Sequence, residues 1–121
     1  MSSSKKILII DDELSLLKIM GKFLQKMGHS SITAENGRKG ISLFGDDPSS
    51  FDAVFIDYNL PELSSHEIVK ELRSLNSEIK VILSTGFAVD DISKEFDQIG
   101  INGTLQKPFA FNDFKQIIEQ L

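Results

Sequence analysis

The stretch KKILIIDDE, Lys5–Glu13, passes directly from four apolar residues to three consecutive acids. A continuous, β-branched run such as ILII is typical of a parallel strand that is covered on both faces. The acids that follow repel one another, because two carboxylates about 5 Å apart cost roughly 3 kcal/mol at an effective dielectric near 20. Their simplest role is to start a helix, whose N-terminus favours negative charge. Whether these acids also have a functional role depends on the polar residues elsewhere in the chain.

The composition indicates one small domain of 121 residues, with Met1–Ser4 as a disordered start or a cloning scar and residues 5–121 as the domain. The chain contains no cysteine, which excludes disulfides and thiolate sites and is compatible with the cytoplasm. The net charge is -5, and the basic residues are scattered along the sequence, which argues against a nucleic-acid surface. No apolar run is long enough to predict a membrane span or a secretion signal.

The helix that follows the acids is predicted from apolar spacings of three and four residues, and Gly28 marks its end. This spacing predicts a buried stripe consisting of Leu16, Ile19, Phe23 and Met27. Leu14 and Leu17 exceed what that stripe requires. They are expected either to add to the core or to dock a helix of a partner protein.

The remaining segments alternate between strands and helices. Apolar or β-branched runs predict strands at 30–34, 51–57, 80–84 and 104–106; amphipathic runs predict helices at 38–44, 65–75, 90–100 and 111–121; a turn is expected at 36–37 and a loop at 45–50. Ser64 and Glu67 form a capping-box pattern at the start of one helix. Five strands that are each followed by a helix predict an α/β fold with a parallel sheet and helices on both faces.

Polar side chains follow these strands at the positions where ligands bind in open α/β sheets. They are Asp11, Asp12, Asp57, Thr85 and Lys107. Three crowded carboxylates predict a site for a hard divalent cation, and Mg2+ suits it best because it keeps positions for water and phosphate oxygens. An ammonium and a hydroxyl beside them indicate an anionic phosphoryl group, which a carboxylate can accept as an aspartyl phosphate.

Four short motifs occur in the expected order, each at the end of a strand: IDDE at 10–13, DYNLP at 57–61, STG at 84–86 and KPF at 107–109. With them the chain resembles a two-component response-regulator receiver domain, a CheY-like protein, over essentially its whole length. The resemblance implies a single-domain (βα)5 flavodoxin-like fold with strand order 2-1-3-4-5. It also implies a signalling switch that assists its own phosphorylation and dephosphorylation, and not an enzyme.

The resemblance also implies a metal site. Asp12 is expected to bind Mg2+ directly and Asp11 mainly through water. Asp57 and the backbone carbonyl of Asn59 are expected to complete the protein ligands, with Mn2+ as a substitute for Mg2+.

The remaining implied residues handle the phosphoryl group. Asp57 is expected to be the phosphoacceptor, Thr85 to hydrogen-bond the phosphoryl oxygens and Lys107 to pair with them. The Lys107–Pro108 peptide bond is expected to be cis, as is usual in this family.

The implied phosphodonor is a phosphohistidine on a histidine kinase or a histidine phosphotransfer protein, in the cytoplasm. Neither nucleic acid nor membrane is expected as a partner, and a phosphorylation-dependent homodimer is left open. The stretches TGF and GTLQKPF also resemble receivers attached to hybrid sensor kinases.

Three positions depart from the commonest family pattern. Thr104 replaces an aromatic residue that swings inward in many receivers, Ser65 replaces a frequent glycine, and Phe87 replaces a polar residue. Phe87 is therefore expected to slow loss of the phosphoryl group by shielding it from water.

Three other classes of protein are alternatives to a receiver domain. A haloacid-dehalogenase-like phosphohydrolase usually has a second acid two residues after its nucleophile, where this chain has Asn59. A flavin-binding module would need a Ser/Thr/Gly-rich phosphate loop in place of the first acids. A pseudo-receiver would lack site residues that are present here.

Overall fold

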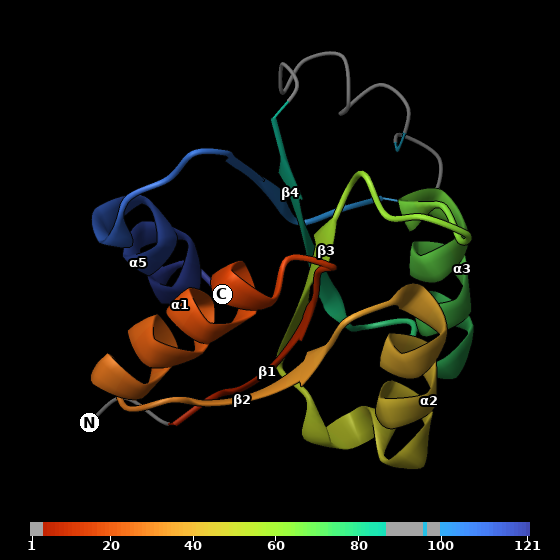
Figure 1. Ribbon diagram of the computed structural model, residues 1–121. Helices are drawn as coiled ribbons and strands as arrows, with labels where there is room; N and C mark the ends of the chain where they lie inside the picture. The colour runs from red at the N-terminus through yellow and green to blue at the C-terminus, as the bar shows by residue number, and fades with distance from the viewer. Residues whose placement is uncertain (1–3, 87–95, 97–99) are drawn as a thin grey trace.

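The computed structural model describes residues 4–86, 96 and 100–121, and its centre is one five-stranded parallel sheet in the order β2-β1-β3-β4-β5 (Figure 1). The strands are β1 (Lys6–Ile10), β2 (Ser30–Ala34), β3 (Ala53–Asp57), β4 (Lys80–Thr85) and β5 (Gly103–Gln106). The predicted strand order and the parallel pairing are confirmed. The order reverses between β1 and β3, so the carboxyl ends of these two strands border the place where such folds bind ligands.

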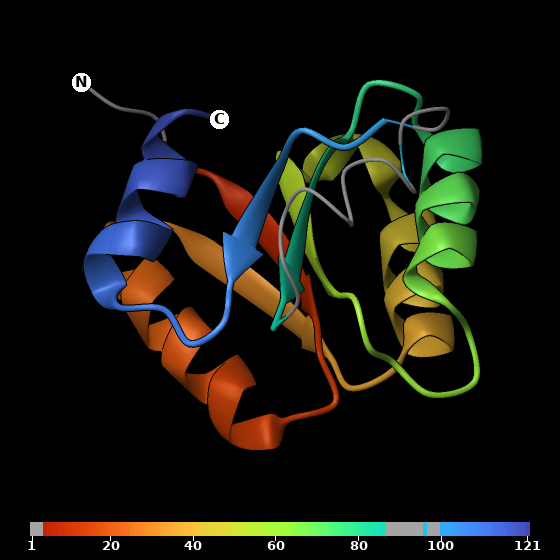
Figure 2. The same cartoon turned by 90° about the horizontal axis from the view of Figure 1, so that it is seen from above.

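The described helices cover both faces of the sheet, as Figures 1 and 2 show. They are α1 (Leu14–Lys26), α2 (Gly37–Asp46), α3 (Ser65–Leu75) and α5 (Phe111–Glu119). Seen from above, α1 and α5 lie on one side of the sheet, and α2 and α3 lie on the other (Figure 2). None of these helices is long and apolar enough to cross a membrane.

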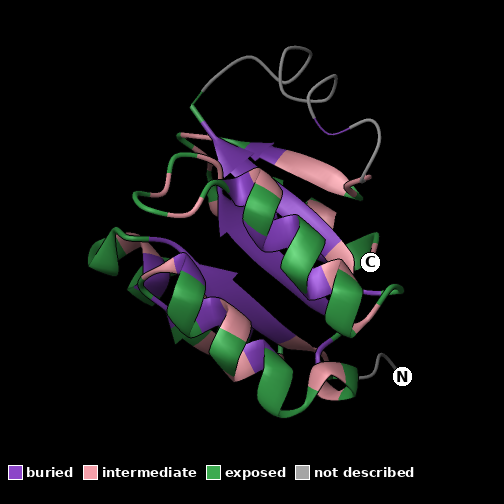
Figure 3. Cartoon of the chain, turned by 90° about the vertical axis from the view of Figure 1, so that its right-hand side faces the viewer, coloured by how far each residue is buried: buried purple, intermediate pink, exposed green. Residues whose placement is uncertain are grey.

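The core has two parts because the sheet separates them. Strands β1 and β3 are buried along most of their length, and the buried residues of the helices face them (Figure 3). The residues of β1 alternate between the two parts, since Leu8 and Ile10 pack under α2 and α3, and Ile7 and Ile9 pack under α1 and α5. This explains why the run ILII is apolar at every position.

Helix α1 packs on the sheet in a different rotation from the predicted one. Its buried residues are Leu17, Met20 and Leu24. The prediction that Ile19 belongs to the core is wrong, because Ile19 is 45% exposed. Leu16, Phe23 and Met27 lie at the edges of the buried stripe and are half-buried. Leu14 is 58% exposed, so the apolar residues in excess of the core are Leu14 and Ile19.

Several predicted boundaries also change. Asn36 is the N-cap of α2 and accepts a hydrogen bond from the Lys39 N–H at 2.8 Å, where a turn was expected. The predicted loop at 45–50 instead continues α2 to Asp46 and then forms a short 3-10 helix, Pro48–Ser50. Strand β3 begins at Ala53, two residues later than predicted, and α5 ends at Glu119. The predicted helix at 90–100 lies almost wholly outside the described residues, and so does Phe87.

Gly40 sets the close contact between α2 and β1, because a Cβ there would lie 2.7 Å from Cγ1 of the buried Ile10. In Gly40→Ala we expect the free energy of unfolding to fall by about 1–2 kcal/mol, since the cost of overpacking exceeds the gain in helix propensity. Gly45 in the same helix is the matched control, because a Cβ there meets only Leu75 Cδ1 at an ordinary 3.7 Å. Urea unfolding should show Gly45→Ala unchanged or stabilised, and an unaffected Gly40→Ala would contradict the packing argument.

Candidate functional site

The predicted site residues meet at the carboxyl edge of the sheet. Asp11 follows β1, Asp57 ends β3, Thr85 ends β4 and Lys107 follows β5. The strand register aligns Asp57 with Ser84 and Thr85 with Gln106, which brings the strand ends level with one another. A hollow of about 480 Å³ opens there, lined by Asp12, Glu13, Asp57, Asn59, Gly86 and Lys107.

Lys107 joins the two buried carboxylates of the site. Its Nζ lies 3.1 Å from Asp11 Oδ2 and 3.3 Å from Asp57 Oδ1. Its backbone N–H donates to the Thr85 carbonyl at 2.7 Å, which ties the loop after β5 to the end of β4. The cis peptide bond between Lys107 and Pro108 is confirmed. The ammonium is therefore aimed at the carboxylates by both the sheet and the loop.

Asp11 uses both of its carboxylate oxygens within the protein. Oδ1 accepts the backbone N–H of Glu13 at 2.9 Å, and Oδ2 accepts a hydrogen bond from Lys107. The neighbouring Asp12 is exposed and lines the hollow. Asp11 is thus engaged by two partners within the protein, whereas Asp12 presents an exposed carboxylate at the hollow.

Asp57 is buried, with 5% of its surface exposed, and its Oδ1 accepts the Asn59 backbone N–H at 3.2 Å. Burial and then the negative charge of Asp11 raise the pKa of Asp57, while the Asn59 N–H and Lys107 act in the opposite direction. Burial would lower the pKa of Lys107, but the charges of Asp11 and Asp57 outweigh it and the pKa is raised. The lysine therefore stays charged, but its positive charge does not offset the effects of burial and of Asp11 on Asp57, which leaves a deficit of positive charge at Asp57.

A divalent cation fits this deficit. Asp11, Asp12 and Asp57 each offer a carboxylate oxygen, and these oxygens lie within 4.8 Å of one another. The ligand set contains oxygen donors without nitrogen or sulfur, which suits Mg2+ better than Zn2+ or Cu2+. The chemistry of the donors and the raised pKa of Asp57 point to the same kind of ion.

Two of the three departures from the family pattern, Thr104 and Ser65, lie in the described part of the chain. Thr85 is buried at the end of β4, and Thr104 is half-buried on β5, where it aligns with Leu83. Ser65 is the first residue of α3, whose N-cap Ser64 accepts the Glu67 N–H at 3.1 Å. The Ser64 half of the predicted capping box is confirmed, and Ser65 is accommodated as a buried residue of the first helical turn.

Two features of the site were not predicted from the sequence. Glu13, interpreted as a helix-start acid, also lies 3.9 Å from Lys107 Nζ and lines the hollow. Tyr58, next to Asp57, has its ring centroid 6.3 Å from that of the buried Phe96, and the His66 ring centroid lies 5.5 Å from that of Phe96. The third acid of DDE was a signal for Glu13, but no sequence spacing connects Tyr58, His66 and Phe96.

A doubly wound sheet with three carboxylates, a lysine and a threonine at its carboxyl edge defines a CheY-like signalling domain of the flavodoxin-like class. The chain matches the response regulator receiver domain over residues 7–119 and belongs to this family. It is thus a receiver domain of a two-component system. Receiver domains are signalling switches, and they bind Mg2+ at the acidic pocket that Asp11, Asp12 and Asp57 form here.

Known proteins resemble this chain over nearly its full length. It is 24% identical to the sporulation initiation phosphotransferase F of Bacillus subtilis, covering 97% of this chain and 93% of that protein. It is 29% identical to the regulatory protein AtoC of Escherichia coli over 99% of this chain, but spans only 26% of AtoC. The chemotaxis protein CheY4 of Vibrio cholerae has a solved structure with a TM-score of 0.90, 25% identity and 98% coverage of both chains.

Proposed function

We propose that Asp57 accepts a phosphoryl group from a phosphohistidine in a reaction that requires Mg2+, and that this modification switches the contacts of the domain with other proteins. The observation that carries the proposal is the position of Asp57 in the hollow, 3.3 Å from the Lys107 ammonium and within 4.8 Å of two further carboxylates. An Asp is a useful phosphoacceptor only where charge on the incoming oxygens is neutralised, and this site concentrates the groups for that task.

The chain's own residues prepare the acceptor for attack. The Asn59 N–H and Lys107 hold Asp57 Oδ1, so the other carboxylate oxygen is the one oriented for reaction. The new bond forms between that oxygen and phosphorus, the phosphorus–nitrogen bond of the phosphohistidine breaks, and the imidazole keeps the electron pair. Asp11, Asp12, Asp57 and the Asn59 carbonyl would hold Mg2+, which when bound supplies positive charge for the phosphoryl oxygens. Mn2+ is proposed as a substitute because it accepts the same oxygen ligands.

The proposed product stays attached to the protein, so the domain acts as a switch and not as an enzyme with turnover on a free substrate. The Thr85 hydroxyl donates to a phosphoryl oxygen, and Lys107 pairs with another. Because Thr104 has no ring to move, the signal is proposed to pass through the hydrogen bond between Lys107 and Thr85 that joins the ends of β4 and β5. Slow hydrolysis of the aspartyl phosphate resets the switch.

The proposed setting is the cytoplasm, with residues 5–121 as the receiver domain and a histidine kinase or histidine phosphotransfer protein as the donor. Neither nucleic acid nor membrane is proposed as a partner. A phosphorylation-dependent homodimer remains a prediction, and the mass of the phosphorylated protein in solution, measured by light scattering, tests it.

The direct test is incubation with acetyl phosphate and Mg2+ followed by intact-mass measurement. The protein should gain one phosphoryl group, and trapping of the acyl phosphate by borohydride reduction should map it to the peptide that contains Asp57. A sample treated with EDTA should stay unlabelled. Labelling of another residue would refute Asp57 as the acceptor, and an absence of labelling would favour a pseudo-receiver.

The donor is proposed to dock beside the site on the first turns of α1, where Leu14 and Ile19 are exposed. In Leu14→Ser we expect phosphotransfer from a phosphorylated kinase or phosphotransfer protein to slow by about tenfold, since a buried leucine contributes about 1.5–3 kcal/mol and 1.4 kcal/mol is a factor of ten. Labelling by acetyl phosphate should not change, because the small donor needs no docking surface. Leu75→Ser is the matched control, since Leu75 is 44% exposed at the far end of α3. Equal transfer rates for both variants would show that α1 is not the docking surface.

A further inference from the structure

The fold gathers lysines that are scattered in the sequence. Helix α1 contains no Asp or Glu and carries Lys18, Lys22 and Lys26. Lys5, just before β1, and Lys115, in α5, lie against the end of this helix, where they line one hollow together with Lys26. A domain with a net charge of -5 therefore has one hollow whose lining carries three lysines.

This hollow has a volume of about 520 Å³, which is in the range of small-molecule sites. Its lining comes from α1, α5, the residue before β1 and the segment between α1 and β2, and consists of Lys5, Lys26, Met27, His29, Phe111, Lys115, Ile118 and Glu119. Glu119 is the one acid among these residues. The hollow is separate from the Asp57 site, since the two share no lining residue.

The three ammonium groups are not neutralised by the protein. Within the described part of the chain, every ion pair closer than 4.0 Å involves Lys107, and none involves Lys5, Lys26 or Lys115. Lys26 has an ordinary role at the C-terminal end of a helix, where a cation is favoured. Lys5 and Lys115 have no such role, and both are half-buried.

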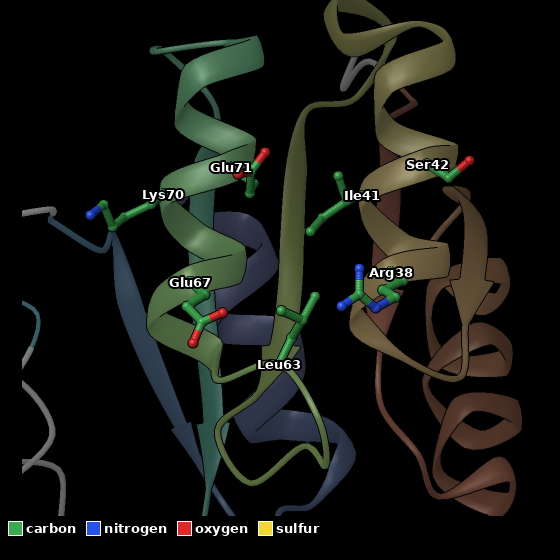
Figure 4. Close-up of a pocket in the computed structure, with 7 residues that line it drawn as sticks. All are labelled: Arg38, Ile41, Ser42, Leu63, Glu67, Lys70 and Glu71. Carbon is green, nitrogen blue, oxygen red and sulfur yellow. The ribbon is translucent and has the colours of Figure 1, made fainter.

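The hollow between α2 and α3 differs because charged residues of both signs line it (Figure 4). There Arg38 of α2 and Glu67 and Glu71 of α3 line the same space, so positive and negative groups balance one another. That mixture indicates no particular class of ligand. The hollow at Lys5, Lys26 and Lys115 has charge of predominantly one sign and therefore selects anions.

His29 adds an imidazole ring to the lining of the hollow. Its Nδ1 accepts the Lys5 backbone N–H at 2.9 Å, which leaves Nε2 to carry the ring proton. The same hydrogen bond fixes the imidazole next to the Lys5 main chain. The anion that fits this hollow can therefore accept hydrogen bonds as well as balance charge.

The floor of the hollow is apolar and partly aromatic. Lys26 Nζ lies 4.6 Å from the centroid of the half-buried Phe111 ring, and the half-buried Met27 completes the accessible floor above the fully buried Ile118. Inorganic phosphate alone would leave this floor unused, and an aliphatic chain would leave three ammonium groups unused. From this combination we propose that the hollow binds a nucleoside di- or triphosphate, with its phosphates at the lysines and its base over the apolar floor.

The test is three separate titrations of the protein, with ATP, pyrophosphate and adenosine, in a buffer that contains EDTA. Binding is measured by the shifts of the backbone amide NMR signals. EDTA removes the cations that could hold a nucleotide at the acidic site, whose carboxylates then repel it. ATP should shift the amides of Gly28, His29 and Lys115 in a saturable way, and pyrophosphate and adenosine should each bind more weakly. Shifts confined to Asn59 and Gly86, equal binding of pyrophosphate, or no shift with ATP would each overturn the proposal.

Variants give a second test, which asks whether the lysines of the hollow hold the nucleotide. Lys26→Gln and Lys115→Gln should each weaken ATP binding by about tenfold, because a hydrogen bond to a charged group contributes about 1.5–3 kcal/mol. Lys39→Gln is the matched control, since it removes the same charge from an exposed position in α2 outside the hollow. Phosphorylation by acetyl phosphate should be unchanged in all three variants. If Lys39→Gln weakened ATP binding equally, the loss of affinity would be explained by net charge alone, and the proposed site would be refuted.

Discussion

Asp57→Asn should abolish phosphorylation and at the same time make the protein more stable. The loss of labelling follows because an amide is not a nucleophile toward phosphorus, so acetyl phosphate with Mg2+ should add no mass to this variant. The gain in stability follows from the environment of Asp57, since burial and the charge of Asp11 raise its pKa in the folded protein. A buried carboxylate that resists ionisation is a cost to the fold at neutral pH, and asparagine removes that cost with almost the same shape.

The pH dependence of this effect has a definite sign. Because the folded pKa of Asp57 lies above its ordinary value of 3.8, the folded state holds the proton more tightly than the unfolded state. Ionisation therefore lowers the stability of the wild type as pH rises through the interval between these two values. The stability gap between Asp57→Asn and wild type should be full above this interval and should shrink as pH falls through it.

Thermal unfolding at several pH values, without divalent cations, measures this gap. A rise of a few degrees in Tm at pH 7 is expected, since 1 kcal/mol moves the Tm of a domain of this size by roughly 3–6 °C. Mg2+ should stabilise the wild type more than the variant, because the variant has lost a metal ligand. Asp52→Asn is a suitable control, since Asp52 is exposed and lies just before β3, outside the hollow. A variant that is labelled, or that is less stable than wild type at every pH, would contradict the interpretation of Asp57.

Much of the fold could be predicted from the sequence because the signals were local. ILII is apolar at every position because β1 lies between two layers of helices, and the acid that ends β3 appears at the same relative place in the next buried strand. The positions of Asp11, Asp57 and Lys107 then followed from the rule that parallel strands bring their carboxyl ends to one edge. The position of the Lys107 ammonium between the two carboxylates could not be predicted in this way and is seen only in the structure.

The errors arose where several residues satisfied the same pattern. Helix α1 has apolar residues at Leu16, Ile19 and Phe23 and also at Leu17, Met20 and Leu24, and both sets have helical spacing. Contact with the sheet selected the second set as the buried one. The basic hollow was invisible for a different reason, because Lys5, Lys26 and Lys115 come together only in the folded chain.

Removal of the lysine from the site should have the opposite effect on stability from removal of the acceptor. In Lys107→Met the carboxylates of Asp11 and Asp57 lose the ammonium that lies 3.1 Å and 3.3 Å from them. Removing one partner of a fully buried ion pair costs about 3–5 kcal/mol, and we expect about 2 kcal/mol here because the Lys107 side chain is 19% exposed and faces the hollow. Methionine keeps most of the side chain's length and apolar contacts, so the change is mainly one of charge.

The pH and metal dependence of Lys107→Met separate this electrostatic cause from a packing defect. Without the ammonium the pKa of Asp57 should rise further, because Lys107 is one of the groups that lower it. The destabilisation should therefore be largest at neutral pH and should fade in acid, whereas a packing defect would persist at all pH values.

Mg2+ should recover part of the lost stability of Lys107→Met, because it replaces positive charge between the carboxylates. Labelling by acetyl phosphate should still be at least tenfold slower than in the wild type, since the ammonium no longer balances charge on the phosphoryl oxygens. Lys39→Met, an exposed substitution of the same type, should leave stability and labelling unchanged. A destabilisation independent of pH and Mg2+ would mean that Lys107 supports the fold by packing alone.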